Sequence, residues 1–255
     1  AEECFSREGD RVNLSRVLHQ LGNTYYLQGE LEKALSYYEQ SSKLAAQCGE
    51  KSVEAAAKIQ EASILFLQGD LEGAQESYEE ALLKAKQIKD EQLCLTVELH
   101  LGQVLYGRGE FLEAEETLRQ ACERAQKLNA AGDLARGLLF LGLVARARGD
   151  LEKAGALFAE AEQKASSLND EVLAGTAAFH KGNALFEQGD LAGSLRALAR
   201  SIEVLEHADL SEAHVPWRLV ETIAKYLGPE TFRRLAEQAG LRALLKGEGK
   251  GLEDI

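Results

Sequence analysis

Methionine is absent from this sequence of 255 residues, and it has only two prolines and one tryptophan. No apolar run approaches the roughly 18 residues of a membrane-spanning helix, so we expect no membrane segment. The amino-terminal end also lacks the pattern of a secretory signal. The four cysteines are scattered, without metal-finger spacing: Cys4, Cys48, Cys94 and Cys122. We therefore expect free thiols in a reducing cytoplasm rather than a disulfide framework.

Basic residues are outnumbered, with 29 lysines and arginines against 42 aspartates and glutamates, so the formal net charge is −13. A nucleic-acid surface needs clustered lysine and arginine side chains to meet phosphates, so direct nucleic-acid binding is disfavoured. The sequence shows no nucleophile beside a base, no carboxylate dyad and no metal-ligand spacing. We expect a protein that is not an enzyme and that carries no cofactor.

What the sequence does contain is a repeat of 40 residues. A glycine, an acidic residue and a large apolar residue recur at 29–31, 69–71, 109–111, 149–151 and 189–191. Small residues recur seven positions before that glycine, at Gly22, Ala62, Gly102, Gly142 and Gly182. They recur again five positions after it, at Ala34, Ala74, Ala114, Ala154 and Ser194. A fixed period near 40 indicates a solenoid of stacked units.

Each repeat is predicted to form two helices. The turn glycine ends the first helix, and the acidic residue after it suits the N-cap of the second. We place the first helices at 15–28, 55–68, 95–108, 135–148 and 175–188. The two sets of small residues lie 12 apart, one on each helix, and are expected to face each other and let the helix axes approach closely.

The spacing of Leu21, Gly22, Tyr25, Gly29, Ala34 and Tyr38 resembles that of the tetratricopeptide (TPR) repeat. The period is longer than the usual 34 residues. With this longer repeat the chain is similar to Pins/LGN-type polarity adaptors, kinesin light chains, bacterial peptide-pheromone receptors and the TPR sensor arms of bacterial regulators. The resemblance implies an all-α, right-handed TPR superhelix of about five helix-turn-helix repeats that acts by binding.

The repeats are predicted to occupy residues 9–206. Residues 207–245 are interpreted as a degenerate sixth repeat that caps the stack, with helices from Pro216 to about Leu227 and from Pro229 to about Ala239. Residues 246–255, with three glycines, are expected to form a tail. Residues 1–8 align with the end of a preceding repeat, followed by a loop at Gly9–Asp10, which with the missing methionine favours further sequence upstream; a short capping helix is the alternative.

The five predicted first helices contain seven basic and three acidic residues. This excess favours a groove that binds an acidic segment. The alternative is that first helices are buried and poor in all charges, while second helices present a solvated acidic face.

Polar side chains follow one stripe of each first helix at helical spacing. In TPR proteins the first helices line the concave groove, so the resemblance implies that Asn23 and Asn183 bond the backbone of a bound peptide. Ser63 and Gln103 would substitute for them in other repeats, and Arg16 and Arg136 would pair with ligand carboxylates. The candidate groove residues are Arg16, Gln20, Asn23, Gln60, Ser63, His100, Gln103, Arg136, His180 and Asn183.

Two functions remain open at this point. One is an adaptor that binds a protein or peptide; the other is the sensor arm of a larger bacterial regulator, coupling ligand or partner binding to upstream domains. His100 and His180 share a repeat position but lie two repeats apart, so they do not predict a metal site. The side chains of Asn23 and Arg136 are expected to point away from the core.

Overall fold

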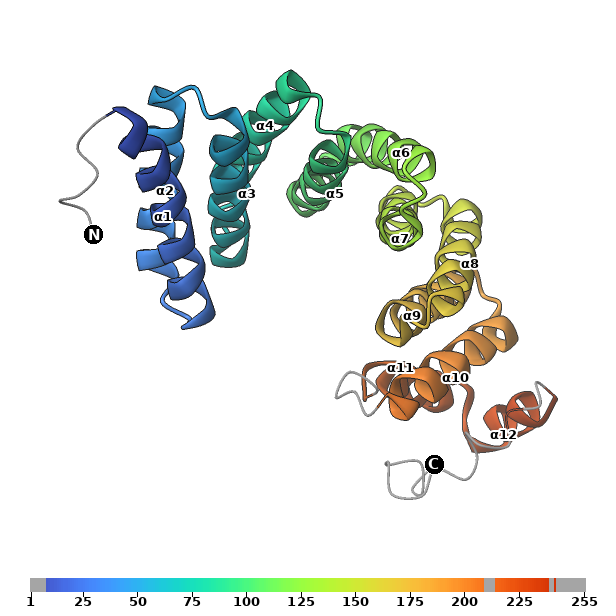
Figure 1. The fold of residues 1–255 in the computed structure, drawn as a ribbon. Coiled ribbons are helices and arrows are strands. Elements are labelled where there is room, and N and C mark those ends of the chain that lie inside the picture. The colour runs from blue at the N-terminus through green and yellow to red at the C-terminus, as the bar shows by residue number, and fades with distance from the viewer. Residues whose placement is uncertain (1–7, 209–213, 239–240, 242–255) are drawn as a thin grey trace. The chain divides into compact units, whose positions relative to one another are not determined.

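The computed structural model describes residues 8–208, 214–238 and 241. Within these ranges the chain forms twelve α-helices and no strand (Figure 1). The helices are α1 (Glu8–Leu27), α2 (Leu31–Gln47), α3 (Lys51–Gln68), α4 (Leu71–Ile88), α5 (Glu91–Arg108), α6 (Phe111–Lys127), α7 (Ala131–Ala147), α8 (Leu151–Ser167), α9 (Glu171–Glu187), α10 (Leu191–His207), α11 (His214–Leu227) and α12 (Pro229–Gln238). None of them combines the length and apolar character that crossing a bilayer requires.

The helices form consecutive antiparallel pairs, which confirms the predicted all-α TPR architecture. The chain divides into two compact units, residues 1–128 with α1 to α6 and residues 129–255 with α7 to α12. The amino-terminal unit contains repeats 1 to 3. The carboxy-terminal unit contains repeats 4 and 5 and the last helix pair.

The first helices begin earlier than predicted. In repeats 2 to 5 they start four residues before the expected position, at 51, 91, 131 and 171, and α1 includes Gly9 and Asp10, which were expected in a loop. The loop that joins consecutive repeats turns through a left-handed residue, which is glycine only at Gly49 and is Lys89, Asn129 or Asn169 elsewhere. Lys89, Asn129 and Asn169 are weaker turn signals than glycine. They do not explain the whole error, because the helix that follows Gly49 was also placed four residues late.

The turn inside each repeat is a Schellman motif. In repeat 2, Gly69 has a φ of 82°, its amide bonds to the carbonyl of Phe66 at 3.0 Å, and the amide of Asp70 bonds to the carbonyl of Leu65 at 2.9 Å. These bonds satisfy two carbonyl groups that the end of α3 leaves free. The turn glycine therefore ends the first helix, as predicted.

The acidic residue after that glycine caps the second helix only where it is aspartate. Asp70, Asp150 and Asp190 accept a hydrogen bond from the backbone amide three residues later, whereas Glu30 and Glu110 make no such bond. The short aspartate side chain suits the capping geometry, and the longer glutamate is disfavoured at this position. The predicted cap is confirmed for the aspartates and wrong for the glutamates.

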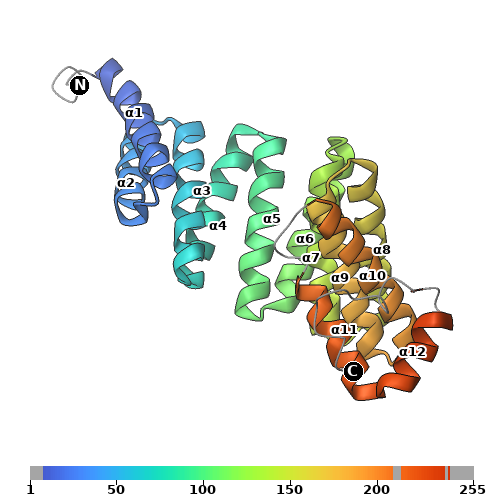
Figure 2. The same ribbon diagram turned by 90° about the horizontal axis from the view of Figure 1, so that it is seen from below.

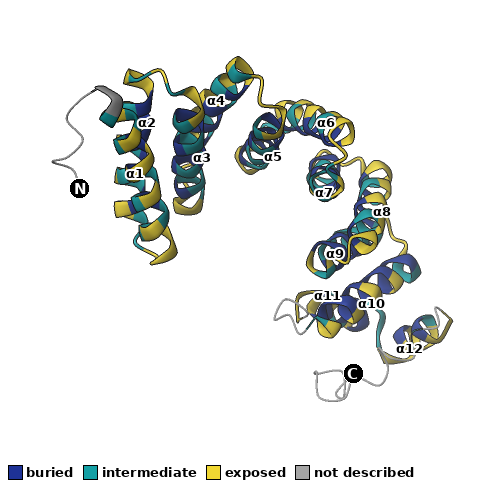
Figure 3. Cartoon of the chain, in the orientation of Figure 1, coloured by how far each residue is buried: buried dark blue, intermediate teal, exposed yellow. Residues whose placement is uncertain are grey.

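The recurring small residue of the first helix lies against a large residue of the second. A Cβ on Gly102 would lie 2.5 Å from Leu118, and one on Gly142 would lie 2.5 Å from Phe158. Leu118 and Phe158 are fully buried. The glycines thus make room for a bulky partner, which refines the expectation that two small residues face each other. Figure 3 shows the outcome, with α5 mostly buried or intermediate and α6 carrying an exposed stripe.

The last helix pair covers the apolar side of α10. Trp217 and Val220 of α11 and Phe232 of α12 share one buried cluster with Leu198 and Ile202 of α10. The indole of Trp217 also donates to Glu206 at 3.0 Å. The observed helices begin or end within two residues of the expected bounds. The expected half-repeat at 1–8, except for Glu8, and the expected tail at 246–255 lie outside the described residues.

Candidate functional site

Seven of the predicted groove residues lie on the first helices of the amino-terminal unit. We call α1, α3 and α5 the first-helix row; these helices follow one another along one side of that unit (Figure 2). The row carries Arg16, Gln20, Asn23, Gln60, Ser63, His100 and Gln103. The other three lie in the carboxy-terminal unit, Arg136 on α7 and both His180 and Asn183 on α9.

Asn23 is held by the core rather than pointing freely away from it. Its Oδ1 accepts a hydrogen bond from the hydroxyl of Tyr38 at 2.7 Å, and Tyr38 is only 1% exposed. Burial raises the pKa of Tyr38 to about 12, so this phenol stays a neutral donor. The Nδ2 of Asn23 has only a 3.5 Å contact with Gln20. The acceptor is therefore occupied, while the donor remains available to a ligand.

Ser63 occupies the matching place in repeat 2 but has no free group. Its hydroxyl bonds to the carbonyl of Ile59 at 2.8 Å and pairs with the hydroxyl of Tyr78 at 2.9 Å. Gln60 and Gln103 differ, because each is partly exposed and makes no hydrogen bond with any described residue. The amides ready to meet a ligand in this unit are therefore those of Gln20, Asn23, Gln60 and Gln103.

The two histidines serve as packing rings. His100 stacks on Tyr78 with ring centroids 5.6 Å apart, and His180 stacks on Phe158 at 5.6 Å. Burial, together with the nearby charge of Arg146, lowers the pKa of His180 to about 4. In the described part of the chain no three His, Cys, Asp or Glu side chains gather in a way that would hold a metal ion.

Asn183 makes a different hydrogen bond from Asn23. Its Nδ2 donates to the carbonyl of Phe179, one turn earlier on the same helix, at 3.1 Å. Leu198 stands where Tyr38 and Tyr78 stand in repeats 1 and 2, so no hydroxyl reaches this asparagine. The acceptor oxygen of Asn183 is the atom left for a ligand.

The expected excess of positive charge on the first helices is wrong. With the observed bounds, α1, α3, α5, α7 and α9 contain eight basic and nine acidic residues, a net charge of −1. The additional acidic residues lie at the amino-terminal ends of these helices, where the helix dipole favours negative charge. The two stripe arginines are exposed and already paired, Arg16 with Glu50 at 3.5 Å and Arg136 with Asp133 at 2.7 Å.

Two residues missing from the predicted set are the most exposed leucines of the row. Leu27 is 85% exposed and Leu67 is 60% exposed, and they occupy matching positions near the ends of α1 and α3. These two helices are in direct contact. The sequence did contain a signal for their exposure. The same position is glycine, alanine and glutamate in repeats 3 to 5, so the repeat does not need a buried apolar side chain there.

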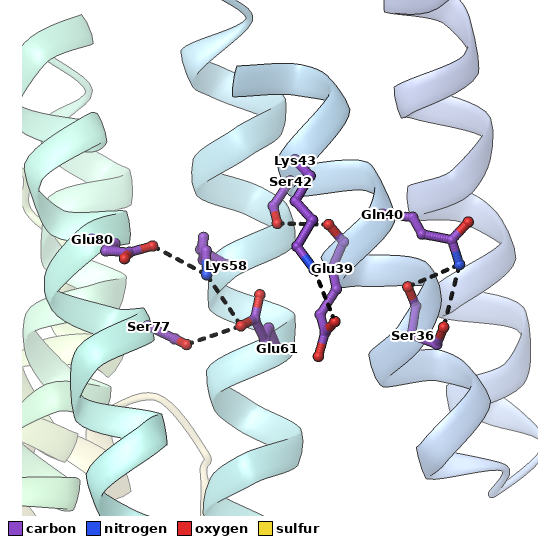
Figure 4. A network of polar contacts seen from close by, with 9 residues as sticks. All are labelled: Ser36, Glu39, Gln40, Ser42, Lys43, Lys58, Glu61, Ser77 and Glu80. Atoms are coloured by element: carbon purple, nitrogen blue, oxygen red, sulfur yellow. Dashed lines mark hydrogen bonds and ion pairs between the residues drawn. The ribbon is translucent and has the colours of Figure 1, made fainter. Parts of the chain in front are cut away.

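A second surface lies beside the second helices. In the amino-terminal unit, α2, α3 and α4 enclose a cleft of about 450 Å³ lined by four glutamates and two lysines. Figure 4 shows its centre, where Lys58 bridges Glu61 and Glu80, both at 3.1 Å, and Ser77 donates to Glu61 at 3.3 Å. The other oxygen of Glu61 is buried and has no hydrogen-bond partner.

The carboxy-terminal unit has the matching cleft between α8, α9 and α10. It encloses about 290 Å³ and is lined by Glu162, Lys181, Leu185, Asp190, Gly193, Arg196, Ala197 and Arg200. Lys181 occupies the position of Glu61 and pairs with Glu162 at 3.3 Å. The charged residues that replace the leucine of repeats 1, 3 and 4 are thus members of ion pairs.

Solved structures with this fold include several TPR proteins. A signal transduction ATPase with a TPR sensor from Pyrococcus horikoshii superimposes with a TM-score of 0.77 at 14% identity, over 96% of this chain and 38% of that one. A Rap protein complexed with competence and sporulation factor gives 0.70 at 17% identity, over 93% and 67%. YrrB, a TPR protein with an unusual peptide-binding site, gives 0.53 at 19% identity, over 73% and 84%.

These likenesses, at identities below 20%, concern the fold. No curated protein matches the sequence. The profile of the MalT-like TPR region matches residues 8–166, which span more than half of the chain and run from the start of α1 to the last turn of α8. The chain therefore belongs to the MalT-like TPR family.

Proposed function

We propose that this protein binds a protein or peptide segment along the first-helix row of its amino-terminal unit. The observation that carries this proposal is the set of amides at Gln20, Asn23, Gln60 and Gln103, whose N–H groups are unused or weakly used. An amide donates and accepts hydrogen bonds, so a series of them suits the backbone of an extended segment. Binding through the backbone tolerates many sequences.

The exposed leucines give the row its selectivity. Leu27 and Leu67 lie near the carboxy-terminal ends of α1 and α3. An apolar side chain of the ligand that packs on them would remove their apolar surface from water, which favours binding. The balanced charge of the first helices offers no reason for an acidic ligand. The segment proposed here is therefore neutral and carries at least one large apolar side chain.

A sensor arm within a larger regulator is the second candidate. It is supported by the TPR-sensor ATPase, of which this chain spans 38% while 96% of this chain is matched. In that case the same row would receive the ligand, and binding would act on domains elsewhere in the regulator. The cytoplasm remains our proposed location, since Cys48, Cys94 and Cys122 are free thiols and the last two are buried.

A site-specific crosslinking experiment tests the binding surface. A photoreactive residue placed at Gln60 or Gln103 should capture the partner in cells that contain this protein. The same residue placed at Gln126, which is exposed on α6, serves as the control and should capture nothing. Capture at Gln126 alone would move the binding surface to the second helices.

The captured segment then allows a quantitative test. Gln103→Ala should weaken its binding by about 0.5–1.5 kcal/mol, the contribution of one hydrogen bond. Fold stability should not change, because Gln103 bonds to no described residue. Asn23→Ala is a poorer probe, since removing its Oδ1 leaves the buried Tyr38 hydroxyl unpaired.

A further inference from the structure

Repeats 2 and 5 carry opposite charges at three matched positions, one buried or half-buried on the first helix and two exposed on the second. The pairs, each separated by 120 residues, are Glu61 and Lys181, Glu76 and Arg196, and Glu80 and Arg200. Repeats 1, 3 and 4 have leucine at the first of these positions. At the other two positions repeats 3 and 4 have one glutamate each, Glu116 and Glu160, so only repeat 2 has glutamate at both and only repeat 5 has arginine at both.

The acidic member of each pair lies in the amino-terminal unit. Glu76 is exposed and has no ion pair or hydrogen bond with any described residue. Glu80, whose side chain is 59% exposed, pairs with Lys58 at 3.1 Å. Glu76 and Glu80 are one turn apart on α4, so they present two carboxylates on the same face. We call this pair the acidic face; the neighbouring cleft adds a further excess of glutamates.

The basic members lie at the matching place in the carboxy-terminal unit. Arg196 is exposed and, within the described ranges, makes no ion pair or hydrogen bond. Arg200, with a side chain 48% exposed, pairs with Glu203 at 3.2 Å. Both arginines line the cleft between α8, α9 and α10. We call Arg196 and Arg200 the basic face.

We propose that the acidic face of one copy of this chain binds the basic face of a second copy. The matched spacing on α4 and α10 lets two arginines meet two carboxylates, and arginine forms strong bidentate pairs with carboxylates. Neither face is complementary to itself, so the contact joins two different surfaces. After one contact has formed, each of the two copies still has one unused face. Further copies can therefore add to give a head-to-tail chain, or the chain can close into a ring.

This contact is independent of the proposed ligand surface. The faces belong to the second helices α4 and α10, whereas the ligand would lie along α1, α3 and α5. Failure of either proposal would therefore leave the other standing.

Sedimentation velocity over a concentration series of the full chain tests the contact. At about 0.1 M salt the Debye length is near 10 Å, and we expect the wild type to associate. Raising the salt to about 1 M shortens that length to roughly 3 Å and should return the protein to the monomer. Arg196→Ala/Arg200→Ala and Glu76→Gln/Glu80→Gln should each weaken association by roughly two- to thirty-fold, as expected for the loss of two exposed ion pairs.

Mixing the two double variants makes the test decisive. One retains only the acidic face and the other only the basic face, so the mixture should form a 1:1 complex that grows no further. The control is Glu116→Gln/Arg119→Ala on α6, an exposed ion pair outside both faces, which should associate like the wild type. A wild type that stays monomeric, double variants that associate normally, or a mixture that stays monomeric would overturn the proposal.

Discussion

Repeat 2, formed by α3 and α4, and repeat 5, formed by α9 and α10, share one backbone design. Their turn glycines, Gly69 and Gly189, have φ values of 82° and 85°. Their caps, Asp70 and Asp190, accept from the amide three residues later at 3.0 and 2.8 Å. The surfaces differ, since the outer cleft is acidic in repeat 2 and more basic in repeat 5. A few positions thus determine the hairpin, and the remaining positions are free to change their chemistry.

The largest expected effect concerns the shared design. A Cβ on Gly182 of repeat 5 would lie 2.9 Å from Leu198 and 3.4 Å from the carbonyl oxygen of Ser194. Gly182→Leu should therefore lower the free energy of unfolding by about 3 kcal/mol through overpacking. Urea denaturation followed by circular dichroism measures this change. The control is Gly155→Leu on α8, where a Cβ meets nothing within 4 Å, and where no loss is expected.

The repeat and its turns were predictable because they depend on local rules. The turn glycine and the aspartate cap each depend on a few neighbouring residues, and the 40-residue period repeats them along the chain. The structure confirms all three. The starts of the first helices in repeats 3 to 5 were harder to predict, because Lys89, Asn129 and Asn169 adopt a left-handed conformation that is more common for glycine. The start of α3 after Gly49 was missed by the same four residues, although glycine is the usual signal there.

The candidate site was predictable only in part. Its placement on first helices followed from the repeat, but the hydrogen bonds of Asn23 and Ser63 depend on Tyr38 and Tyr78, which lie 15 residues away on the paired helix. The charge of the first helices was misjudged because their amino-terminal turns, rich in acidic residues, were left out. Contacts between helices decided the first outcome, and the helix bounds decided the second.

The second prediction concerns acid stability. The neutral ring of His180 is favoured in the folded state, since burial lowers its pKa from 6.5 to about 4. A lowered pKa means that the unfolded chain takes up the proton first, so stability is full above about pH 6.5 and is lost as the pH falls toward about 4. Between about pH 7.5 and about pH 5 the loss should be about 2 kcal/mol.

Repeat 2 supplies the matched variant for this test, because Gln60 stands at the position of His180. His180→Gln should reduce the pH dependence of the urea midpoint. An equal pH dependence in wild type and His180→Gln would show that other groups cause the acid loss.

A smaller difference in stability is expected between Ser63 of repeat 2 and Asn183 of repeat 5, which occupy the same repeat position. Ser63→Ala removes the hydroxyl that pairs with Tyr78, a residue only 2% exposed, and should lower stability by about 1 kcal/mol. Asn183→Ala removes only a bond to the carbonyl of Phe179 on the same helix and should cost less than about 0.5 kcal/mol. Thermal unfolding of the two variants measures the difference, and a larger loss from Asn183→Ala would contradict this view of their roles.

The smallest effects are expected at the charge-reversed pair itself, where leucine is the residue of the other repeats. Glu61 is 9% exposed and holds one unpaired oxygen, so Glu61→Leu should leave stability unchanged or raise it by about 1 kcal/mol. Lys58 would keep its pairing with Glu80. Lys181 has a side chain 32% exposed, so Lys181→Leu should change stability by less than about 0.5 kcal/mol.

Both variants should also keep the self-association of the wild type, since Glu76, Glu80, Arg196 and Arg200 remain. Urea denaturation and sedimentation velocity on the same samples separate the two properties. A loss of more than about 1 kcal/mol in Glu61→Leu would mean that the buried carboxylate supports the fold, because removing one partner of a needed buried ion pair is strongly destabilising. A loss of association at unchanged stability would instead extend the acidic face inward to Glu61.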